Sequence, residues 1–230
     1  MALPIPANCV AQWRLANDLL DSSGNNHHLT DQGTITYDGT WATFGTGDYG
    51  ELLSDNSAFS KDYNNAFSLE FFMSTSMTLL VGIMGKYNGK GYLAGDIAGG
   101  YVKWQTGNHP ALMRWKVTTG TFNDGNPHHI LCTNDGSDTL AGFKLFVDAT
   151  EVAVTTQDNK TLSMITTPNF RLGAAITGGG YNWYTGLLRM ARFWSADVSA
   201  SASDLYNGGA GVDMFAVGGG SDDHIKRYYY

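Results

Sequence analysis

The chain has 230 residues, of which 43% are hydrophobic, 15% are charged and 29 are glycine. A chain of this length buries roughly 70% of its unfolded surface on folding, so it needs no disulfide or metal to hold a core. The formal net charge of −7 excludes a nucleic-acid backbone as the main partner, because nucleic-acid-binding proteins concentrate Lys and Arg.

Alternating apolar and polar residues predict short strands along the whole chain. In CVAQWRL, Cys9, Ala11 and Trp13 share one face of a predicted strand, and AFSLEFFMS alternates in the same way. Further predicted strands are residues 78–84, 91–97, 101–105, 112–118, 128–133, 143–147, 151–154, 170–172 and 185–194. Gly, Asn and Asp turns separate them. This pattern predicts an all-β fold, a two-sheet antiparallel sandwich.

One short helix is predicted near the C-terminus, in SADVSASASDLYNGG. Ser199 or Ser201 is expected to cap its start, Leu205 to pack against the core, and Asn207 to end it in the left-handed region. No apolar run is long enough for a transmembrane helix. The first residues lack the basic and apolar regions of a signal peptide, so classical secretion is not expected.

Glycines after the helix predict that residues 1–209 form one domain and that residues 210–230 form a Gly-rich tail. The tail ends in three aromatic residues beside two cations, a composition enriched in protein interfaces. We therefore expect the end of the tail to dock on another subunit. The docking residues are Lys226, Arg227, Tyr228, Tyr229 and Tyr230.

Four motifs occur in a characteristic order. They are VAQWRLANDLLDSSGNNHHL, AFSLEFFM, NDGNPHHILCTNDGSDTLAGFKLFVDATEV and YTGLLRMARFWSADVSASASDLYNGG. In this order they resemble the laminin-G-like jelly roll of the concanavalin A-like lectin/glucanase superfamily, over about residues 8–209. Phe72 and Pro127 stand where that family usually has Trp, and Arg189 and Met190 where it has two acidic residues. The resemblance implies a jelly roll and leaves the function open, because the superfamily includes enzymes, lectins and structural modules.

The DSSGNN turn is a candidate calcium site, because some relatives in the family that this chain resembles bind calcium there. Asp21, Asn25 and Asn26 would supply the oxygen ligands that calcium prefers. One alternative is an Asx turn in which Asp21 accepts hydrogen bonds from the backbone. A salt bridge from Arg189 to Asp21 would also replace the cation. No other cofactor is expected.

The histidines and cysteines raise the question of a metal or thiol site. Strand alternation places His128 and Cys132 on one face, roughly 13 Å apart, and His129 on the other. These three residues therefore form no metal site among themselves. A site shared with the second histidine doublet, at residues 27–28, stays open. Cys9 and Cys132 lie in apolar runs and are predicted to be buried free thiols.

The chain has only three glutamates, Glu51, Glu70 and Glu151. Glucanases of the superfamily that it resembles use a Glu-x-Asp-x-x-Glu strand, because the nucleophile and the acid must stand close together across the sugar. None of the three glutamates has Asp two residues later. We therefore predict that the protein is not an enzyme.

Glycan binding without catalysis needs only aromatic faces and a few hydrogen-bonding groups. The predicted glycan-binding residues are Tyr181, Trp183 and Tyr184, in the loop TGGGYNWYTG, together with Trp104. The alternative is that the tryptophans fill the core between the sheets.

The sequence favours a non-catalytic surface display or assembly module. A stand-alone domain of this kind that begins at its own Met without a signal peptide resembles head-decoration or fibre proteins of bacterial viruses, which implies a place on the virion surface. The expected partners are other subunits, in a homo-oligomer, and surface glycans, with no nucleic acid and no membrane insertion. The alternatives are a soluble carbohydrate-binding lectin, cytoplasmic or released by a non-classical route, and a glycoside hydrolase.

Overall fold

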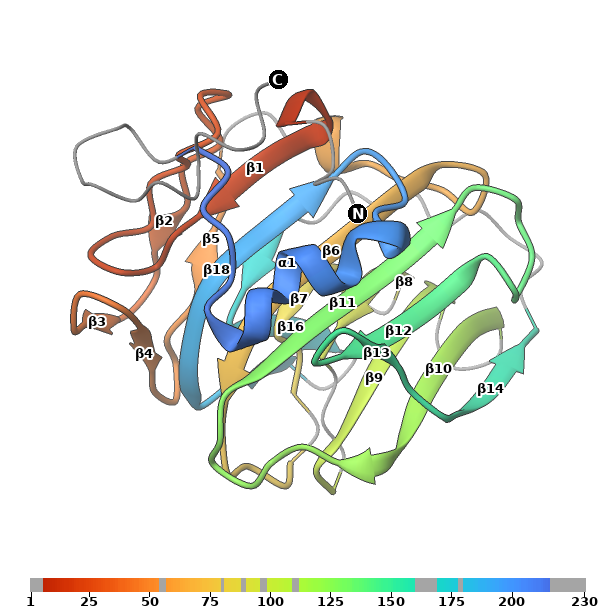
Figure 1. Cartoon of the computed structure of the whole chain (residues 1–230). Helices are drawn as coiled ribbons and strands as arrows, with labels where there is room; N and C mark the ends of the chain where they lie inside the picture. Colours follow the sequence, from red (N-terminus) through yellow and green to blue (C-terminus); the bar gives the residue numbers. More distant parts are fainter. Residues whose placement is uncertain are drawn as a thin grey trace.

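The computed structural model describes residues 6–53, 57–79, 81–87, 90–95, 99–108, 112–159, 169–177 and 180–215. In these residues the strands form two eight-stranded antiparallel sheets and one two-stranded hairpin (Figure 1). One short α-helix lies near the C-terminus. The predicted two-sheet antiparallel sandwich is therefore confirmed.

Sheet A has eight strands, seven of which follow one another in a continuous series. Its strands, in spatial order, are β13 (Thr150–Glu151), β12 (Phe143–Val147), β11 (His128–Asp135), β6 (Ala66–Ser74), β18 (Gly186–Trp194), β4 (Ala42–Phe44) and β3 (Thr36–Tyr37). β1 (Cys9–Trp13) shares one edge of β18 with β4. Met190, which has a positive φ of 49°, lies between the two pairings, where the register of β18 shifts.

Sheet B packs against sheet A across the core. Its strands, in spatial order, are β14 (Val154–Asp158), β10 (Leu112–Thr121), β9 (Tyr101–Asn108), β8 (Lys90–Ala94), β7 (Met84–Tyr87), β15 (Arg171–Leu172), β5 (Gly50–Glu51) and β2 (Thr30–Asp31). The separate hairpin consists of β16 (Ala174–Thr177) and β17 (Gly180–Trp183). Short 3-10 turns are η1 (Pro6–Asn8), η2 (Ser57–Phe59), η3 (Ser199–Ser201) and η4 (Asn207–Gly209).

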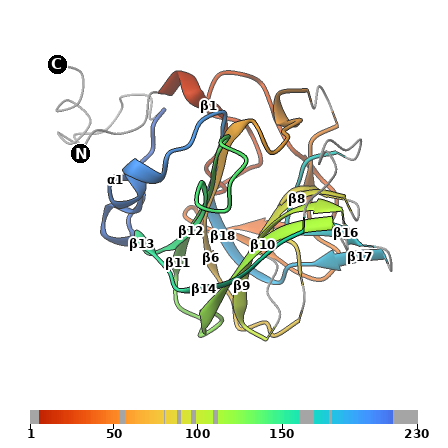
Figure 2. The same cartoon turned by 90° about the vertical axis from the view of Figure 1, so that its right-hand side faces the viewer.

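The layers place the helix and the hairpin on opposite sides of the molecule. Figure 2 shows α1 (Ala202–Tyr206) on the outer side of sheet A and β16 and β17 beyond sheet B. The sandwich core lies between these two layers. No helix in the described part of the chain is long and apolar enough to cross a membrane.

Aromatic rings fill the core between the sheets. The fully buried rings include Trp13, Phe44, Phe59, Phe67, Phe71, Trp104, Phe143, Phe170 and Phe193. The ring centroid of Phe193 lies 4.8 Å from that of Phe59 and 5.9 Å from that of Phe170. Burying one such side chain stabilises the fold by about 1.5–3 kcal/mol. The sandwich thus has the core that the apolar strand faces predict.

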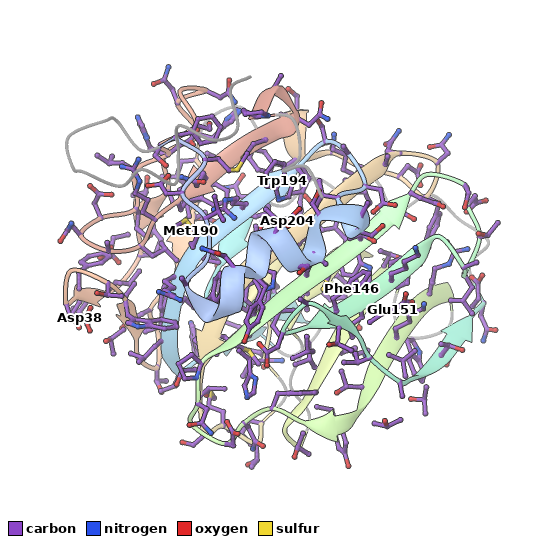
Figure 3. The ribbon with its side chains drawn as sticks, viewed as in Figure 1. Asp38, Phe146, Glu151, Met190, Trp194 and Asp204 are labelled. Carbon is purple, nitrogen blue, oxygen red and sulfur yellow. The ribbon has the colours of Figure 1, made fainter. Side chains whose placement is uncertain are left out.

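A second apolar cluster lies between sheet A and α1. Phe146, Trp194 and Leu205 pack there (Figure 3 labels the first two). Cys9 belongs to this cluster and not, as the sequence predicts, to the face of β1 that carries Ala11 and the core. The prediction is wrong because the register of β1 shifts between Cys9 and Ala11.

The short helix ends as predicted and begins differently. Leu205 is buried, and Asn207 adopts the left-handed conformation with a φ of 47°. Ser201 precedes α1 without making a side-chain capping bond. Instead the Oδ1 atom of Asp197 accepts a 2.9 Å hydrogen bond from the backbone N–H of Ser199. An Asx turn just before the helix thus replaces the predicted serine cap.

A fully buried charge network lies on the helix side of sheet A. Nη1 of Arg192 donates to Oε1 of Glu70 over 2.6 Å, and Nε2 of His129 lies 3.1 Å from the same oxygen. Nε1 of Trp194 donates to Oε2 of Glu70. Burial alone would raise the pKa of Glu70, but Arg192 and His129 outweigh it and lower the pKa from 4.5 to about 2. The side chain of Glu70 is therefore negatively charged at neutral pH.

The same network holds the start of the predicted tail. The Oδ1 atom of Asp213 accepts from Gln12, and its Oδ2 atom accepts from Nε of Arg14, each over 2.6 Å. Arg14 also donates to the carbonyl oxygen of Phe215, over 2.8 Å. Gln12 in turn accepts a 2.7 Å bond from Arg192. Residues 213–215 are thus fastened to the sandwich.

Candidate functional site

Two of the predicted glycan-binding residues form a parallel pair of rings on β17. The rings of Tyr181 and Trp183 lie 7° from parallel, with their centroids 6.0 Å apart. Two residues apart on one strand, they share a face of the hairpin. Tyr181 is 39% exposed, and Trp183 is half-buried. The sequence predicts a loop for this segment, whereas the structure makes it the second strand of a hairpin.

Tyr49 extends this pair, and nothing in the sequence marks it. Its ring centroid lies 5.4 Å from that of Tyr181. Burial raises the pKa of Tyr49 to about 12, and the nearby Tyr181 hydroxyl and Glu51 carboxylate add to the rise. We call Tyr49, Tyr181 and Trp183 the aromatic site.

An ion pair lies directly beneath the aromatic site. Arg171 on β15 stands opposite Glu51 on β5, and its Nη2 atom lies 2.5 Å from Oε1 of Glu51. The guanidinium carbon of Arg171 lies 5.6 Å from the ring centroid of Tyr181. Because the next residue, Leu172, faces the core, Arg171 and Glu51 point to the outer face of sheet B. The pair thus holds the aromatic site from below.

The hairpin is fixed in place by a glycine turn and a small apolar contact. Gly173 joins β15 to β16 with a φ of +91°, and a Cβ atom there would lie 2.6 Å from the ring of Phe44. Ala175 packs with Tyr87 and Leu93 on the outer face of sheet B. The turn and this contact explain why the hairpin folds over that face and carries its rings there.

Trp104 and Tyr184 do not belong to the aromatic site. Both are fully buried. The ring of Trp104 stacks on that of Phe143 at 4.8 Å, and its Nε1 atom donates to the carbonyl oxygen of Thr133. The hydroxyl of Tyr184 lies 3.0 Å from the carbonyl oxygen of Ser74. These two predictions are wrong, because a side chain enclosed by the core presents no face to a sugar.

The predicted calcium turn is closed by its own hydrogen bonds. The carboxylate of Asp21 accepts from the backbone N–H groups of Gln12, Ser23 and His27 at 2.8–3.0 Å, and from the Ser23 hydroxyl. Asn25 turns its NH₂ group inward and donates to the carbonyl of Val10. The structure therefore matches the Asx-turn alternative, because the two carboxylate oxygens of Asp21 already accept four hydrogen bonds from the turn and its neighbours.

Asn26 adopts a left-handed conformation with a φ of 61°. Arg189, a candidate salt-bridge partner of Asp21, lies elsewhere. Its guanidinium carbon is 4.7 Å from the ring centroid of Trp41 and 4.6 Å from that of Phe72. It donates to the carbonyl of Gly209. The expected salt bridge is therefore replaced by a stacked cation that fastens the end of the helix.

The histidines have structural partners, on the two faces that alternation predicts. His128 lies between two carboxylates, with Nδ1 2.8 Å from Asp148 and Nε2 3.2 Å from Asp124. His129 belongs to the buried network with Glu70. In the described ranges no three His, Cys, Asp or Glu side chains converge in a way that would hold a metal.

The two cysteines are buried free thiols, as predicted. Burial raises the pKa of Cys9 to about 12 and holds the pKa of Cys132 well above its usual value. A thiol with such a pKa is a poor nucleophile at neutral pH. Neither cysteine therefore has the environment of a catalytic residue.

The three glutamates lie in three different places. Glu51 is paired with Arg171 in sheet B, and Glu70 is buried in the centre of sheet A. Glu151 is exposed on β13, at the edge of sheet A (Figure 3). The strand order places β12 and β11 between β13 and β6. No two of these glutamates could act on one glycosidic bond.

The predicted docking residues of the tail, Lys226 to Tyr230, lie outside the described residues. The described part of the tail ends at Phe215, which packs partly against the cluster under α1. The docking role of the tail end therefore stays a prediction.

Solved structures share this fold. One is the binding domain of Paraclostridial Mosquitocidal Protein 1, with a TM-score of 0.69 and 11% identity over 88% of this chain and 52% of that one. Another shows botulinum neurotoxin type C, whose cell entry depends on two ganglioside molecules, with a TM-score of 0.65 and 14% identity over 88% of this chain and 52% of that one. The chain thus spans about half the length of these toxin structures.

A third similar structure matches along almost its whole length. It is Domain 4 of AbnA, a GH43 extracellular arabinanase from Geobacillus stearothermophilus, in complex with arabinotriose. The TM-score is 0.65, with 16% identity over 86% of this chain and 97% of that one. No family model and no curated protein matches the sequence. At these identities the similarity establishes the fold alone.

Proposed function

We propose that the chain is a non-catalytic glycan-binding module whose rings at Tyr181 and Trp183 stack on sugar. The parallel, solvent-reaching arrangement of these two rings carries the proposal. Aromatic faces bind the apolar faces of sugar rings, while nearby hydroxyl and amide groups bind the sugar hydroxyls. The structural similarity to a domain seen with arabinotriose supports the same function.

The charged groups support binding without catalysis. Glycoside hydrolysis requires two carboxyl groups roughly 5–10 Å apart across the scissile bond. The glutamate nearest the aromatic site, Glu51, is held by Arg171, and the other two glutamates lie on sheet A. The hydrolase alternative therefore has no carboxylate pair to use among the glutamates.

Replacing Trp183 by alanine is expected to weaken glycan binding at least tenfold, because stacking on an aromatic ring contributes about 1.4 kcal/mol or more. A glycan array followed by calorimetry measures this. Trp115→Ala is the matched control, since Trp115 is also half-buried on the outer face of sheet B, beside Gln157. Unchanged binding by Trp183→Ala would refute the site, and loss only in Trp115→Ala would move it to β10.

The arrangement of the two faces suits display on a larger assembly. The aromatic site lies beyond sheet B, whereas α1 and residues 213–215 lie on the sheet A side (Figure 2). A tail that leaves from the sheet A side can anchor the domain while the rings face outward. We propose that the module is displayed in this way on a virion surface. The soluble lectin remains the alternative function.

Deleting residues 218–230 tests the anchor. We expect the full chain to form a homo-oligomer and the truncated chain to be monomeric by light scattering, with an unchanged melting temperature because Asp213 and Phe215 are retained. Equal masses for the two chains would rule out the tail as the anchor. A monomeric full chain that still binds glycans would favour the soluble lectin.

A further inference from the structure

The charge at the aromatic site is balanced by a single pair of side chains. Arg171 and Glu51 are the charged groups in contact with it among the described residues, and they neutralise each other across 2.5 Å. Nε and Nη1 of Arg171 make no hydrogen bond within the described part of the chain, so its contact with Glu51 runs through Nη2 alone. Both residues are more than nine-tenths buried. The pair therefore presents almost no net charge to a ligand above it.

The aromatic rings add no charge to the site. Tyr49 is neutral at physiological pH, as any tyrosine is, and burial and the neighbouring Tyr181 move its pKa further upward. Trp183 has a neutral indole, whose Nε1 atom is buried and makes no hydrogen bond to the described residues. A ligand therefore meets uncharged aromatic rings over a compensated ion pair.

We propose that the Glu51–Arg171 pair makes the aromatic site select neutral over acidic glycans. This inference rests on the proposed function. An acidic sugar gains no attraction from Arg171, because Glu51 already neutralises that guanidinium. Its carboxylate therefore gives up water at the site without a compensating cation, which a neutral sugar does not have to do. Removing the charge of Glu51 leaves an uncompensated guanidinium beneath the rings, and its positive charge favours carboxylate and sulfate ligands. Glu51 thus determines specificity by cancelling a charge.

The test compares neutral and acidic sugars of the same shape. A glycan array should pair neutral oligosaccharides with their uronate analogues, such as galactotriose with trigalacturonate. We expect the unmodified protein to bind the neutral member of each pair. In Glu51→Gln, binding of the uronate member should rise on the order of tenfold, because one unpaired charge acts over roughly 8 Å. Added salt should weaken only this new binding.

Two variants control for the change in net charge and in stability. Glu151→Gln alters the net charge equally, but Glu151 is exposed on β13, away from the site. The double variant Glu51→Gln/Arg171→Gln restores neutrality at the site and should restore the preference for neutral sugars. If Glu51→Gln unfolds, Arg171→Gln decides the question, because it leaves the Glu51 carboxylate uncompensated and should weaken uronate binding below that of the unmodified protein. Unchanged uronate binding in Arg171→Gln would overturn the charge selection.

The outcomes separate this inference from the function on which it rests. If the unmodified protein binds no glycan on the array, the proposed function itself fails. If it binds glycans through Trp183 but binds uronates as well as their neutral partners, only the charge selection is overturned. The charge selection is also overturned if Glu51→Gln behaves like Glu151→Gln.

Discussion

Replacing Glu70 by glutamine is expected to lower the free energy of unfolding by about 3–5 kcal/mol. The change leaves the side-chain shape nearly constant and removes the negative charge. Arg192, which is fully buried, then loses its anionic partner at 2.6 Å and keeps the neutral Gln12 as an acceptor, while its Nη2 atom makes no hydrogen bond to the described residues. A buried charge without an opposite charge is costly, because neutral groups only partly replace the water that it gave up. Urea denaturation at pH 7 measures the loss, with Glu151→Gln as the exposed control.

In acid, the free energies of unfolding of the unmodified protein and of Glu70→Gln should become similar. The folded-state pKa of Glu70 is lowered from 4.5 to about 2, so its stabilising contribution is complete above pH 4.5 and is lost as the pH falls toward 2. The difference between the unmodified protein and Glu70→Gln should therefore shrink from pH 4.5 downward. A difference below about 1 kcal/mol at pH 7, or one that grows in acid, would contradict the role assigned to this ion pair.

Replacing Trp104 by alanine is expected to lower the free energy of unfolding by about 3–5 kcal/mol, an effect of the same size. The substitution leaves a cavity beside Phe143, whose ring lies 12° from parallel to the indole, and it removes a hydrogen bond to Thr133. Surrounding side chains from two packed sheets relax only in part into such a cavity. Denaturant titration gives the free energy, and the glycan array gives the binding of the same sample below its unfolding transition.

The two tryptophans that the sequence groups together should behave oppositely. Trp104→Ala should lose stability and keep glycan binding while folded, whereas Trp183→Ala should lose glycan binding and little stability, because Trp183 is only half-buried. A folded Trp104→Ala protein without glycan binding would show that Trp104 contributes to the glycan-binding site. A Trp104→Ala protein as stable as the unmodified one would show that the indole does not support the core.

Long alternating segments predict the fold well. The strands around Phe67 and His128 form where expected, but they are buried on both faces, because one face lies in the core between the sheets and the other carries the charge network and the cluster under α1. Short strands are missed where two residues are too few to show a period, as in β2 and β5. The segment 78–84 is apolar but mostly outside the strands, and Leu79 is 68% exposed there. Composition alone does not separate such a loop from a strand.

The candidate site was only partly predictable. Tyr181 and Trp183 are conspicuous because aromatic residues follow a glycine run, but the same signal also selects Tyr184, which the turn into β18 directs into the core. Tyr49 and Arg171 meet the rings through pairing between β5 and β15, which are 120 positions apart at Glu51 and Arg171. Pairing across such a distance leaves no local pattern, so the sequence by itself does not reveal it.

The pairing of β1 with β18 joins the beginning of the sandwich to its end. β18 is also a central strand, since β6 pairs with its other edge. During synthesis, sheet A therefore stays open until residues 186–194 have left the ribosome, and β6 exposes an unpaired edge until then. Folding that depends on contacts between such distant segments is slow, because a long chain must close before they form. Products that end before Gly186 should be cleared by proteases or aggregate, and chaperones that cover strand edges should raise the yield of the complete protein.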